Sequence, residues 1–362
     1  MGLAKKILNI VLAIVNVLTF YIRRKPNRIT FISLTSNTLT SDFKLIDDML
    51  KESGKYDIHY NLIRFEQNMM GDLKYFFNCL KQLIEMKKSA LIILNDNNYI
   101  VSTRKPKGCK VLQIWHACGA VKKFGNEIKR QYPINNYDYV ISNADYWKPV
   151  YAKSFNVKED QVITTGMPRL DTLLKNQEMD SFYQKHPECK GKKLVLYAPT
   201  FRGNIIDGFH MVTPDITKMD LSPDTLILYK FHPLLGDMKL DGKQCINMNA
   251  EDLYVLMNVS DVLISDYSSV FFDWSLLNKP YISYIPDIET YQENIGLNID
   301  YEKDFPGPVC HNEKELSDAL YADGSVYLDK RKKFKEKYMK YDDGQNTKRV
   351  VQFIEHILGK ML

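Results

Sequence analysis

The chain has 362 residues, of which 45% are hydrophobic and 12% aromatic, so it is long enough for two well-cored domains. Its formal net charge of +5 suits anionic substrates or a membrane surface, and it lacks the basic stripe with interleaved aromatic residues that single-strand nucleic-acid binders use, so nucleic acid is not expected as a partner. Six cysteines are scattered without CxxC pairs, which argues against a disulfide framework and a zinc site.

Residues 3–22 are mostly apolar and have basic residues on both sides. At 100° per residue, the polar positions fall on one stripe: Lys5, Asn9, Asn16, Thr19 and Arg23. The pattern predicts an amphipathic helix, residues 1–25, that lies in a membrane interface with its basic ends near anionic lipid. A helix docked on the protein's own core is one alternative. A signal peptide or a spanning segment is another, although the apolar run is short for a span.

Apolar runs then alternate with helical segments. Strands are predicted at residues 28–34, 56–63, 90–94, 110–115, 139–142, 161–164, 193–197, 225–229, 262–264 and 281–284. Helices are predicted at residues 42–52, 73–88 and 271–277. This alternation predicts an α/β protein with parallel sheets, and a hydrophilic stretch divides the runs in two. We therefore expect two doubly wound domains, residues 26–180 and 181–335, and a C-terminal helix that folds back, residues 336–362.

Ligands of doubly wound sheets bind outside the carboxyl ends of the strands, which for two domains means a cleft that both domains face. Residues suited to an anionic ligand follow five predicted strands: His116, Arg169, Thr200 with Arg202, Lys230 with His232, and Ser268 with Ser269. A single histidine at a strand end is usually structural. Together, these residues predict a phosphate or pyrophosphate site with a histidine from each domain and no metal-ligand set.

The segment 262–287 carries the clearest phosphate signal, because it reads as strand, serine turn, helix and strand. A helix that begins at the carboxyl end of a parallel strand directs unpaired N–H groups and partial positive charge toward a ligand. Ser268 and Ser269 add hydroxyls at that point. An ordinary capped helix is the alternative. The chain contains neither a GxxxxGK[ST] nor a GxGxxG motif.

Five ordered motifs resemble those of the CDP-glycerol glycerophosphotransferase family of Gram-positive teichoic acid synthesis: WHACGAVKKFG, GMPRLD, YAPTFR, KFHP and SDYSSVFFDWSLLNKPYISYIPD. The resemblance implies a GT-B-like fold and peripheral association with the cytoplasmic face of the membrane. It also implies transfer of glycerol phosphate from CDP-glycerol to a hydroxyl with release of CMP, and no cofactor is expected.

The resemblance also implies roles for single residues. His116 matches the histidine of the family's WHG-type motif and His232 that of its KxHP-type motif, and both are essential-type histidines there. Residues expected to line the donor site are Trp115, Gly119, Arg169, Pro199, Thr200, Arg202, Lys230, Phe231, Ser268, Ser269 and Asp273. We interpret His116 as the general base. His232, Lys230 and the N–H groups of the serine turn would stabilise charge on the pyrophosphate.

Two departures from the family pattern matter. Ala117 stands where the usual form has glycine, and this variant resembles the primase subgroup. That subgroup adds the first glycerol phosphate to N-acetylmannosaminyl-N-acetylglucosamine carried on undecaprenyl diphosphate. Ile295-Gly296 replaces an Arg-Gly pair, so no donor contact is expected from that arginine. An elongating poly(glycerol phosphate) or ribitol phosphate transferase, and a GT-B sugar transferase that uses a UDP-sugar, stay open as alternatives.

Overall fold

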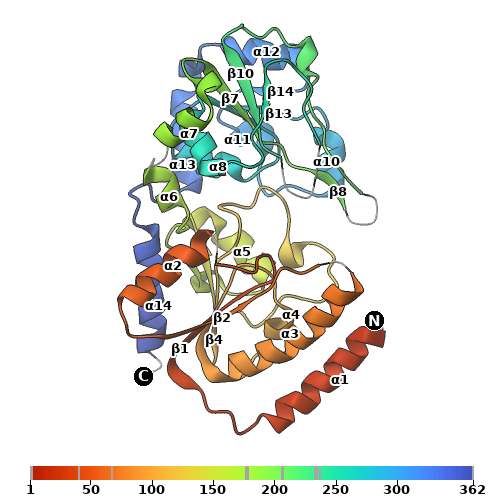
Figure 1. Cartoon of the computed structure of the whole chain (residues 1–362), viewed down its shortest axis with the longest axis vertical. Helices are drawn as coiled ribbons and strands as arrows, with labels where there is room; N and C mark the ends of the chain where they lie inside the picture. Colours follow the sequence, from red (N-terminus) through yellow and green to blue (C-terminus); the bar gives the residue numbers. More distant parts are fainter. Residues whose placement is uncertain are drawn as a thin grey trace. The chain divides into compact units, whose positions relative to one another are not determined.

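The computed structural model describes residues 3–39, 41–66, 68–175, 179–204, 208–231, 235 and 238–360. The chain divides into two compact units (Figure 1). The first unit comprises Met1–Ala117, Phe124–Arg169 and Gln345–Leu362, and the second comprises Cys118–Lys123 and Leu170–Gly344. Each unit contains its own parallel sheet, which confirms the predicted α/β class with two doubly wound sheets. The borders of the predicted domains stay predictions.

The sheet of the first unit has the strand order β2-β1-β3-β4-β5-β6. Its strands are β1 (Lys25–Ser33), β2 (Asp57–Leu62), β3 (Ser89–Leu94), β4 (Lys110–Gln113), β5 (Tyr139–Ser142) and β6 (Val162–Thr164). The helices of this unit are α1 (Leu3–Leu18), α2 (Ser41–Glu52), α3 (Met69–Lys88), α4 (Tyr99–Arg104), η1 (Gly125–Glu127), η2 (Asp145–Trp147), α5 (Lys148–Phe155), η3 (Glu159–Gln161) and α14 (Asn346–Gly359). β3 is buried along its whole length, as a parallel strand covered on both faces should be.

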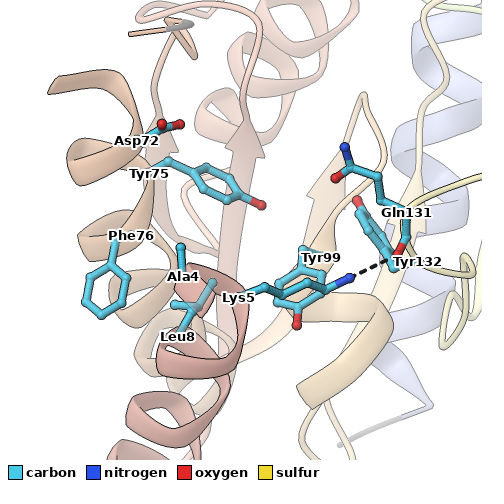
Figure 2. Close-up of a pocket in the computed structure, with 9 residues that line it drawn as sticks. All are labelled: Ala4, Lys5, Leu8, Asp72, Tyr75, Phe76, Tyr99, Gln131 and Tyr132. Carbon is cyan, nitrogen blue, oxygen red and sulfur yellow. Dashed lines mark hydrogen bonds between the residues drawn. The ribbon is translucent and has the colours of Figure 1, made fainter. Parts of the chain in front are cut away.

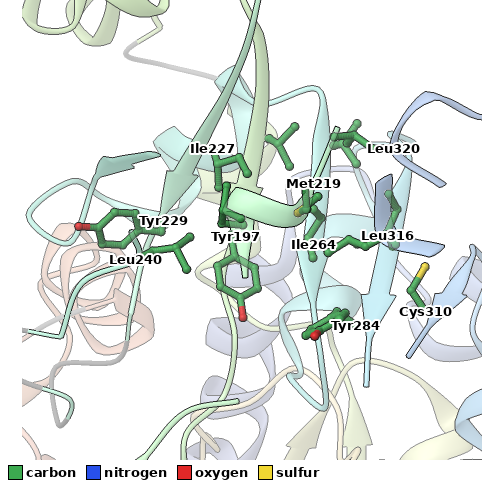
Figure 3. Packing of buried hydrophobic residues seen from close by; sticks show 14 of the residues in the cluster. Tyr197, Met219, Ile227, Tyr229, Leu240, Ile264, Tyr284, Cys310, Leu316 and Leu320 are labelled. Carbon is green, nitrogen blue, oxygen red and sulfur yellow. The ribbon is translucent and has the colours of Figure 1, made fainter. Parts of the chain in front are cut away.

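The sheet of the second unit has the order β11-β10-β7-β12-β13-β14, and β8 pairs with β9 as a separate hairpin. The strands are β7 (Lys193–Tyr197), β8 (Arg202–Asn204), β9 (Gly208–His210), β10 (Thr225–Tyr229), β11 (Cys245–Asn247), β12 (Val262–Ser265), β13 (Tyr281–Tyr284) and β14 (Val309–Cys310). The helices are α6 (Leu170–Lys175), α7 (Met179–Lys185), η4 (Pro187–Cys189), η5 (Ile216–Lys218), α8 (Leu253–Val259), α9 (Val270–Ser275), α10 (Ile288–Asn294), α11 (Tyr301–Asp304), α12 (Glu313–Tyr321), η7 (Gly324–Tyr327) and α13 (Leu328–Tyr338). Figure 3 shows Tyr197, Ile227 and Ile264, from three neighbouring strands, in one buried cluster.

The strand orders place a topological switch point in each sheet. The chain fills one side of β7 with β10 and β11 and then crosses to β12, so the switch point of the second sheet lies between β7 and β12. By the same rule, the switch point of the first sheet lies between β1 and β3. Ligands of open parallel sheets bind at the carboxyl ends of the strands at such points.

Element ends differ from the prediction where local hydrogen bonds decide them. α3 begins at Met69, four residues before the predicted start, because the Asn68 side chain accepts a hydrogen bond from the N–H of Gly71 at 2.7 Å and caps the helix. α9 ends at Ser275, two residues early, and Asn278 then turns the chain at a φ of 54°. The short strands β8, β9, β11 and β14 were not predicted, because two or three residues carry no readable period.

Helix α1 packs on α3, and Leu8 and Leu12 are buried in the first unit. The polar stripe of α1 also faces the protein, since Asn9 Oδ1 accepts a hydrogen bond from the Tyr99 hydroxyl at 2.8 Å. Figure 2 shows Lys5 reaching across a pocket of about 300 Å³. Its Nζ lies 5.5 Å from the centroid of the Tyr99 ring, within the range of a cation–π interaction.

The opposite face of α1 is apolar and exposed. It consists of Ile7, Ile10, Ile14, Val17 and Leu18, and we call it the exposed face of α1. Ile10 and Val17 are 62% and 68% exposed. Five exposed large apolar residues on one face of a helix form a contiguous apolar patch, which is unusual on a protein surface. Within the residues that the structure describes, no helix has the length and apolar character needed to cross a membrane.

Candidate functional site

His116 lies just past the carboxyl end of β4. Its Nδ1 is 3.3 Å from the carbonyl oxygen of Asn95, so a proton on Nδ1 donates to that oxygen and leaves the lone pair on Nε2. Protein atoms around the ring desolvate it, and this desolvation and the positive charge of Arg169 lower the pKa of His116 below its ordinary value. Part of the side chain still reaches the solvent. The imidazole is therefore neutral near pH 7 and able to accept a proton.

The turn after β3 fixes the carbonyl that faces His116. Asp96 Oδ2 accepts a hydrogen bond from the N–H of Leu34 at 2.7 Å, and Gln113 Nε2 donates to the Asp96 carbonyl at 2.7 Å. These bonds tie the carboxyl end of β3 to the ends of β1 and β4. The Asn95 carbonyl is thereby held in place beside the imidazole, which sets the orientation of the ring.

Arg169 pairs with an aspartate that the sequence did not single out. Its Nη1 lies 2.8 Å from Asp42 Oδ2, and its backbone N–H donates to Asp42 Oδ1, also at 2.8 Å. Asp42 lies in the first turn of α2, 127 residues away along the chain, so no local pattern reveals the pair. The pair offsets part of the positive charge on which the prediction relied, and a contact with the donor stays a prediction.

In the second unit, predicted site residues lie past the carboxyl ends of β7 and β12, the two strands on either side of the switch point. Thr200, three residues past β7, donates from its N–H and from its hydroxyl to Asp266 Oδ1, both at 2.8 Å. Asp266 is buried and follows β12 directly. Asp266 belongs to the SDYSSVFFDWSLLNKPYISYIPD motif but was not predicted as a site residue. Its signal is a carboxylate placed immediately after a buried strand.

Arg202 is buried between two carboxylates. Its Nη1 lies 2.8 Å from Asp266 Oδ2, and its Nε and Nη2 donate to Asp287 at 2.8 and 3.1 Å. Burial raises the pKa of Asp287, but the hydrogen bonds and charge of Arg202 outweigh burial and hold that pKa below its ordinary value. Arg202 therefore links the segments that follow β12 and β13 through Asp266 and Asp287. Its contact with a phosphate stays a prediction.

The serine turn joins β12 to α9, as predicted. Ser268 Oγ accepts a hydrogen bond from the N–H of Val270 at 3.3 Å. Ser269 occupies the N-cap position of α9 and makes no capping bond through its side chain. Both hydroxyls lie one turn past β12, at the same sheet edge as Asp266. A role of this turn in phosphate binding stays a prediction.

Lys230 and Phe231 follow β10 and are tied to the loop after β11. Lys230 Nζ donates to the carbonyls of Asn249 and Glu251 at 3.0 and 2.6 Å. Phe231 is buried, and its N–H donates to Asn249 Oδ1 at 2.7 Å. His232, the second predicted histidine, lies outside the described residues.

The remaining predicted residues lie close to these elements. Pro199 is buried two residues past β7, and Gly119 belongs to the segment 118–123 of the second unit. Asp273 is buried on α9 and accepts a hydrogen bond from the Tyr254 hydroxyl at 2.8 Å. The ring centroid of Trp115 lies 3.8 Å from that of the adjacent histidine. In the described part of the chain, no group of three or more His, Cys, Asp or Glu residues is arranged to hold a metal ion.

Comparisons with known proteins identify the family of the chain. Residues 14–356 match the family model described as CDP-Glycerol:Poly(glycerophosphate) glycerophosphotransferase. The chain is 30% identical to the teichoic acid ribitol-phosphate primase of Bacillus spizizenii, over 92% of each chain. It is 28% identical to the teichoic acid glycerol-phosphate primase of Bacillus subtilis, over 85% of this chain and 87% of the relative. The solved wall teichoic acid polymerase TagF shares the fold, with a TM-score of 0.75 over 98% of this chain and 97% of that chain, at 22% identity.

Proposed function

Because the chain belongs to the CDP-glycerol:poly(glycerophosphate) glycerophosphotransferase family, we propose that it is a primase that transfers glycerol phosphate from CDP-glycerol to a lipid-linked disaccharide. Family membership makes it a teichoic acid glycerol- or ribitol-phosphate transferase and implies CDP-glycerol as a substrate. The primase assignment is supported by Ala117 in the histidine motif, which resembles the primase form, and by the matches to two primases over most of their length. A poly(glycerol phosphate) polymerase matches over a similar share, so the number of units added is the deciding test. The proposed acceptor is N-acetylmannosaminyl-N-acetylglucosamine on undecaprenyl diphosphate.

The proposed reaction is a single displacement at phosphorus. The acceptor hydroxyl oxygen attacks the glycerol-bearing phosphorus of CDP-glycerol and forms the new P–O bond. The bond from that phosphorus to the bridging oxygen breaks, and CMP leaves with the electron pair. His116 Nε2 takes the hydroxyl proton, because Nδ1 is directed at the Asn95 carbonyl. Phosphoryl transfer gains mainly from positioning and charge stabilisation, which the groups at the second switch point would supply together with His232.

Nucleotide release tests the choice of donor. CDP-glycerol, CDP-ribitol and a UDP-sugar are supplied separately with a short-chain version of the disaccharide acceptor. We expect acceptor-dependent CMP release from CDP-glycerol. Faster CMP release from CDP-ribitol would favour the ribitol alternative, since a ribitol-phosphate primase is among the relatives. Release of UDP instead would support a sugar transferase and contradict the proposal.

The enzyme is proposed to work at the cytoplasmic face of the membrane, held there by the exposed face of α1. Its apolar residues lie on the side of the helix opposite Leu8 and Leu12, which pack inward. Exposed basic residues, Lys6 and Arg23, flank that face and would attract anionic lipid. The proposal combines the membrane-interface helix and the core-docked helix that the sequence left as alternatives. One side of α1 docks on the protein, and the other side is available to lipid.

Replacing Ile10, Ile14 and Val17 together by asparagine is expected to weaken binding to anionic vesicles at least about 100-fold, because a fully buried side chain of this kind contributes about 1.5–3 kcal/mol. Vesicle flotation measures the effect, and turnover on a soluble short-chain acceptor should be unchanged. Val326→Asn is the matched control, since Val326 is 72% exposed in the second unit. Unchanged flotation of the triple variant would mean that another surface anchors the protein.

A further inference from the structure

Residues 118–123 belong to the second compact unit, although the chain on both sides of them belongs to the first. Lys122 forms an antiparallel bridge with Leu297, and the N–H of Asn298 donates to the carbonyl of Val121 at 2.8 Å. These backbone contacts fix the segment beside the chain that follows α10. These backbone hydrogen bonds therefore hold Lys122 in the second unit.

The ammonium of Lys122 lies over a stack of aromatic rings. Its Nζ is 5.4 Å from the centroid of the Tyr291 ring, and that ring stacks on Tyr267 with centroids 3.7 Å apart. The guanidinium of Arg202 lies 4.7 Å from the Tyr291 centroid and 5.0 Å from the Tyr267 centroid. Asp266 and Arg202 both act electrostatically on Lys122. The lysine thus stands at the switch point between β7 and β12.

Arg202 and Lys122, the two cations at this point, differ in their partners. Arg202 is held by the carboxylates of Asp266 and Asp287. Among the residues that the structure describes, no oxygen atom accepts a hydrogen bond from Lys122 Nζ. Burial lowers the pKa of Lys122 to about 8, and the attraction of Asp266 offsets this only in part. A desolvated ammonium of this kind gains stability when an anion approaches it.

We propose that Lys122 binds the diphosphate of the nucleotide donor at the switch point of the second sheet, an inference that rests on the proposed donor. Ligands of doubly wound sheets bind at such points, and Thr200 and the serine turn lie at the same sheet edge. Arg202 is already committed to two carboxylates, so Lys122 supplies the positive charge that a diphosphate needs. If Lys122 only packed on Tyr291, replacing it would not change the affinity for the donor.

Titration calorimetry of the full chain with CDP-glycerol tests the role. Lys122→Met, which keeps much of the apolar stem but removes the charge, is expected to raise Kd and KM about 10–100-fold, the loss of one charge-assisted hydrogen bond. Lys122→Arg should restore most of the affinity. Lys123→Met is the matched control, because Lys123 is exposed on the same segment. The thermal midpoint of each variant separates binding from folding.

The pH profile gives a second readout that a structural role would not move. The charged lysine binds the anion, so wild-type affinity should fall as pH rises through about 8. Arginine stays charged throughout this range, so Lys122→Arg should bind equally well on both sides of about pH 8. The other charged or titratable groups that face Lys122, which are Asp266, Arg202, Tyr291 and Tyr267, are unchanged in that variant.

The outcomes separate this inference from the proposed function. If wild type binds CDP-glycerol and Lys122→Met binds it equally well, the role of Lys122 is overturned while the proposed function stands. If Lys122→Met does not fold, a Lys122→Arg profile that still falls through about pH 8 overturns the role, because another group then titrates. If wild type binds neither CDP-glycerol nor CDP-ribitol, the proposed function fails and this inference fails with it.

Discussion

Replacing His116 by alanine is expected to lower kcat by about 10²–10⁴-fold, the contribution of a positioned general base. The imidazole is the group that the first unit offers for taking a proton, since its Nδ1 faces the Asn95 carbonyl and its Nε2 keeps a lone pair. KM for the donor should change little, because the proposed phosphate contacts lie in the second unit. Acceptor-dependent CMP release measures the loss.

The control for His116 is a histidine of the same unit that lies away from the sheet edge. His356 is exposed near the end of α14, and His356→Ala should leave kcat unchanged. The fold of the His116→Ala variant should persist, because the ring is solvent-accessible and the hydrogen bond that it makes among the described residues is to a backbone carbonyl. Near-normal CMP release by a folded His116→Ala variant would remove His116 from the mechanism.

Replacing Arg202 by methionine is expected to cost about 3–5 kcal/mol of unfolding free energy, the usual cost of removing one partner of a buried ion pair. Two carboxylates, Asp266 and Asp287, would remain beside an uncharged side chain. Thr200 would also lose the hydrogen bond that its carbonyl accepts from Nη1 at 2.8 Å. Urea unfolding followed by circular dichroism measures the change.

The pH dependence of the Arg202→Met variant identifies the cause. In wild type the pKa of Asp287 is below its ordinary value, so its pair with Arg202 stabilises the fold above that ordinary value and less as pH falls. Without Arg202, desolvation is left to raise the pKa of Asp287, so the deficit should be largest near neutral pH and shrink on acidification. Lys335→Met, which breaks a surface pair with Asp342, should cost less than about 1 kcal/mol. Equal stability of both variants would show that Arg202 does not hold the switch point.

Strand ends were predictable because buried apolar runs are visible in the sequence. His116, Thr200 and Ser268 all follow such runs, and the structure places each just past the carboxyl end of its strand. Pairing across the chain was not predictable. Arg169 and Arg202 looked like free anion-binding cations, but each meets an aspartate from a distant segment. A sequence shows which residues carry charge, whereas only the fold shows which charges are already paired.

Lys122 illustrates the converse. Lys122 lies in the WHACGAVKKFG motif but was not predicted as a site residue, because no periodicity shows that residues 118–123 cross to the second unit. The amphipathic helix was predicted from its polar stripe, yet that stripe faces the protein, where Asn9 accepts a hydrogen bond from Tyr99. Helical periodicity identifies two unlike faces, but it does not say which of them meets the protein.

The measurement that tests the proposed function most directly is the mass of the product formed from CDP-glycerol and a short-chain lipid-linked disaccharide. The proposed primase should add one glycerol phosphate to each acceptor, release one CMP for each product, and then stop while donor remains. A ladder of products with increasing numbers of glycerol phosphates would contradict the primase assignment and identify the chain as a polymerase.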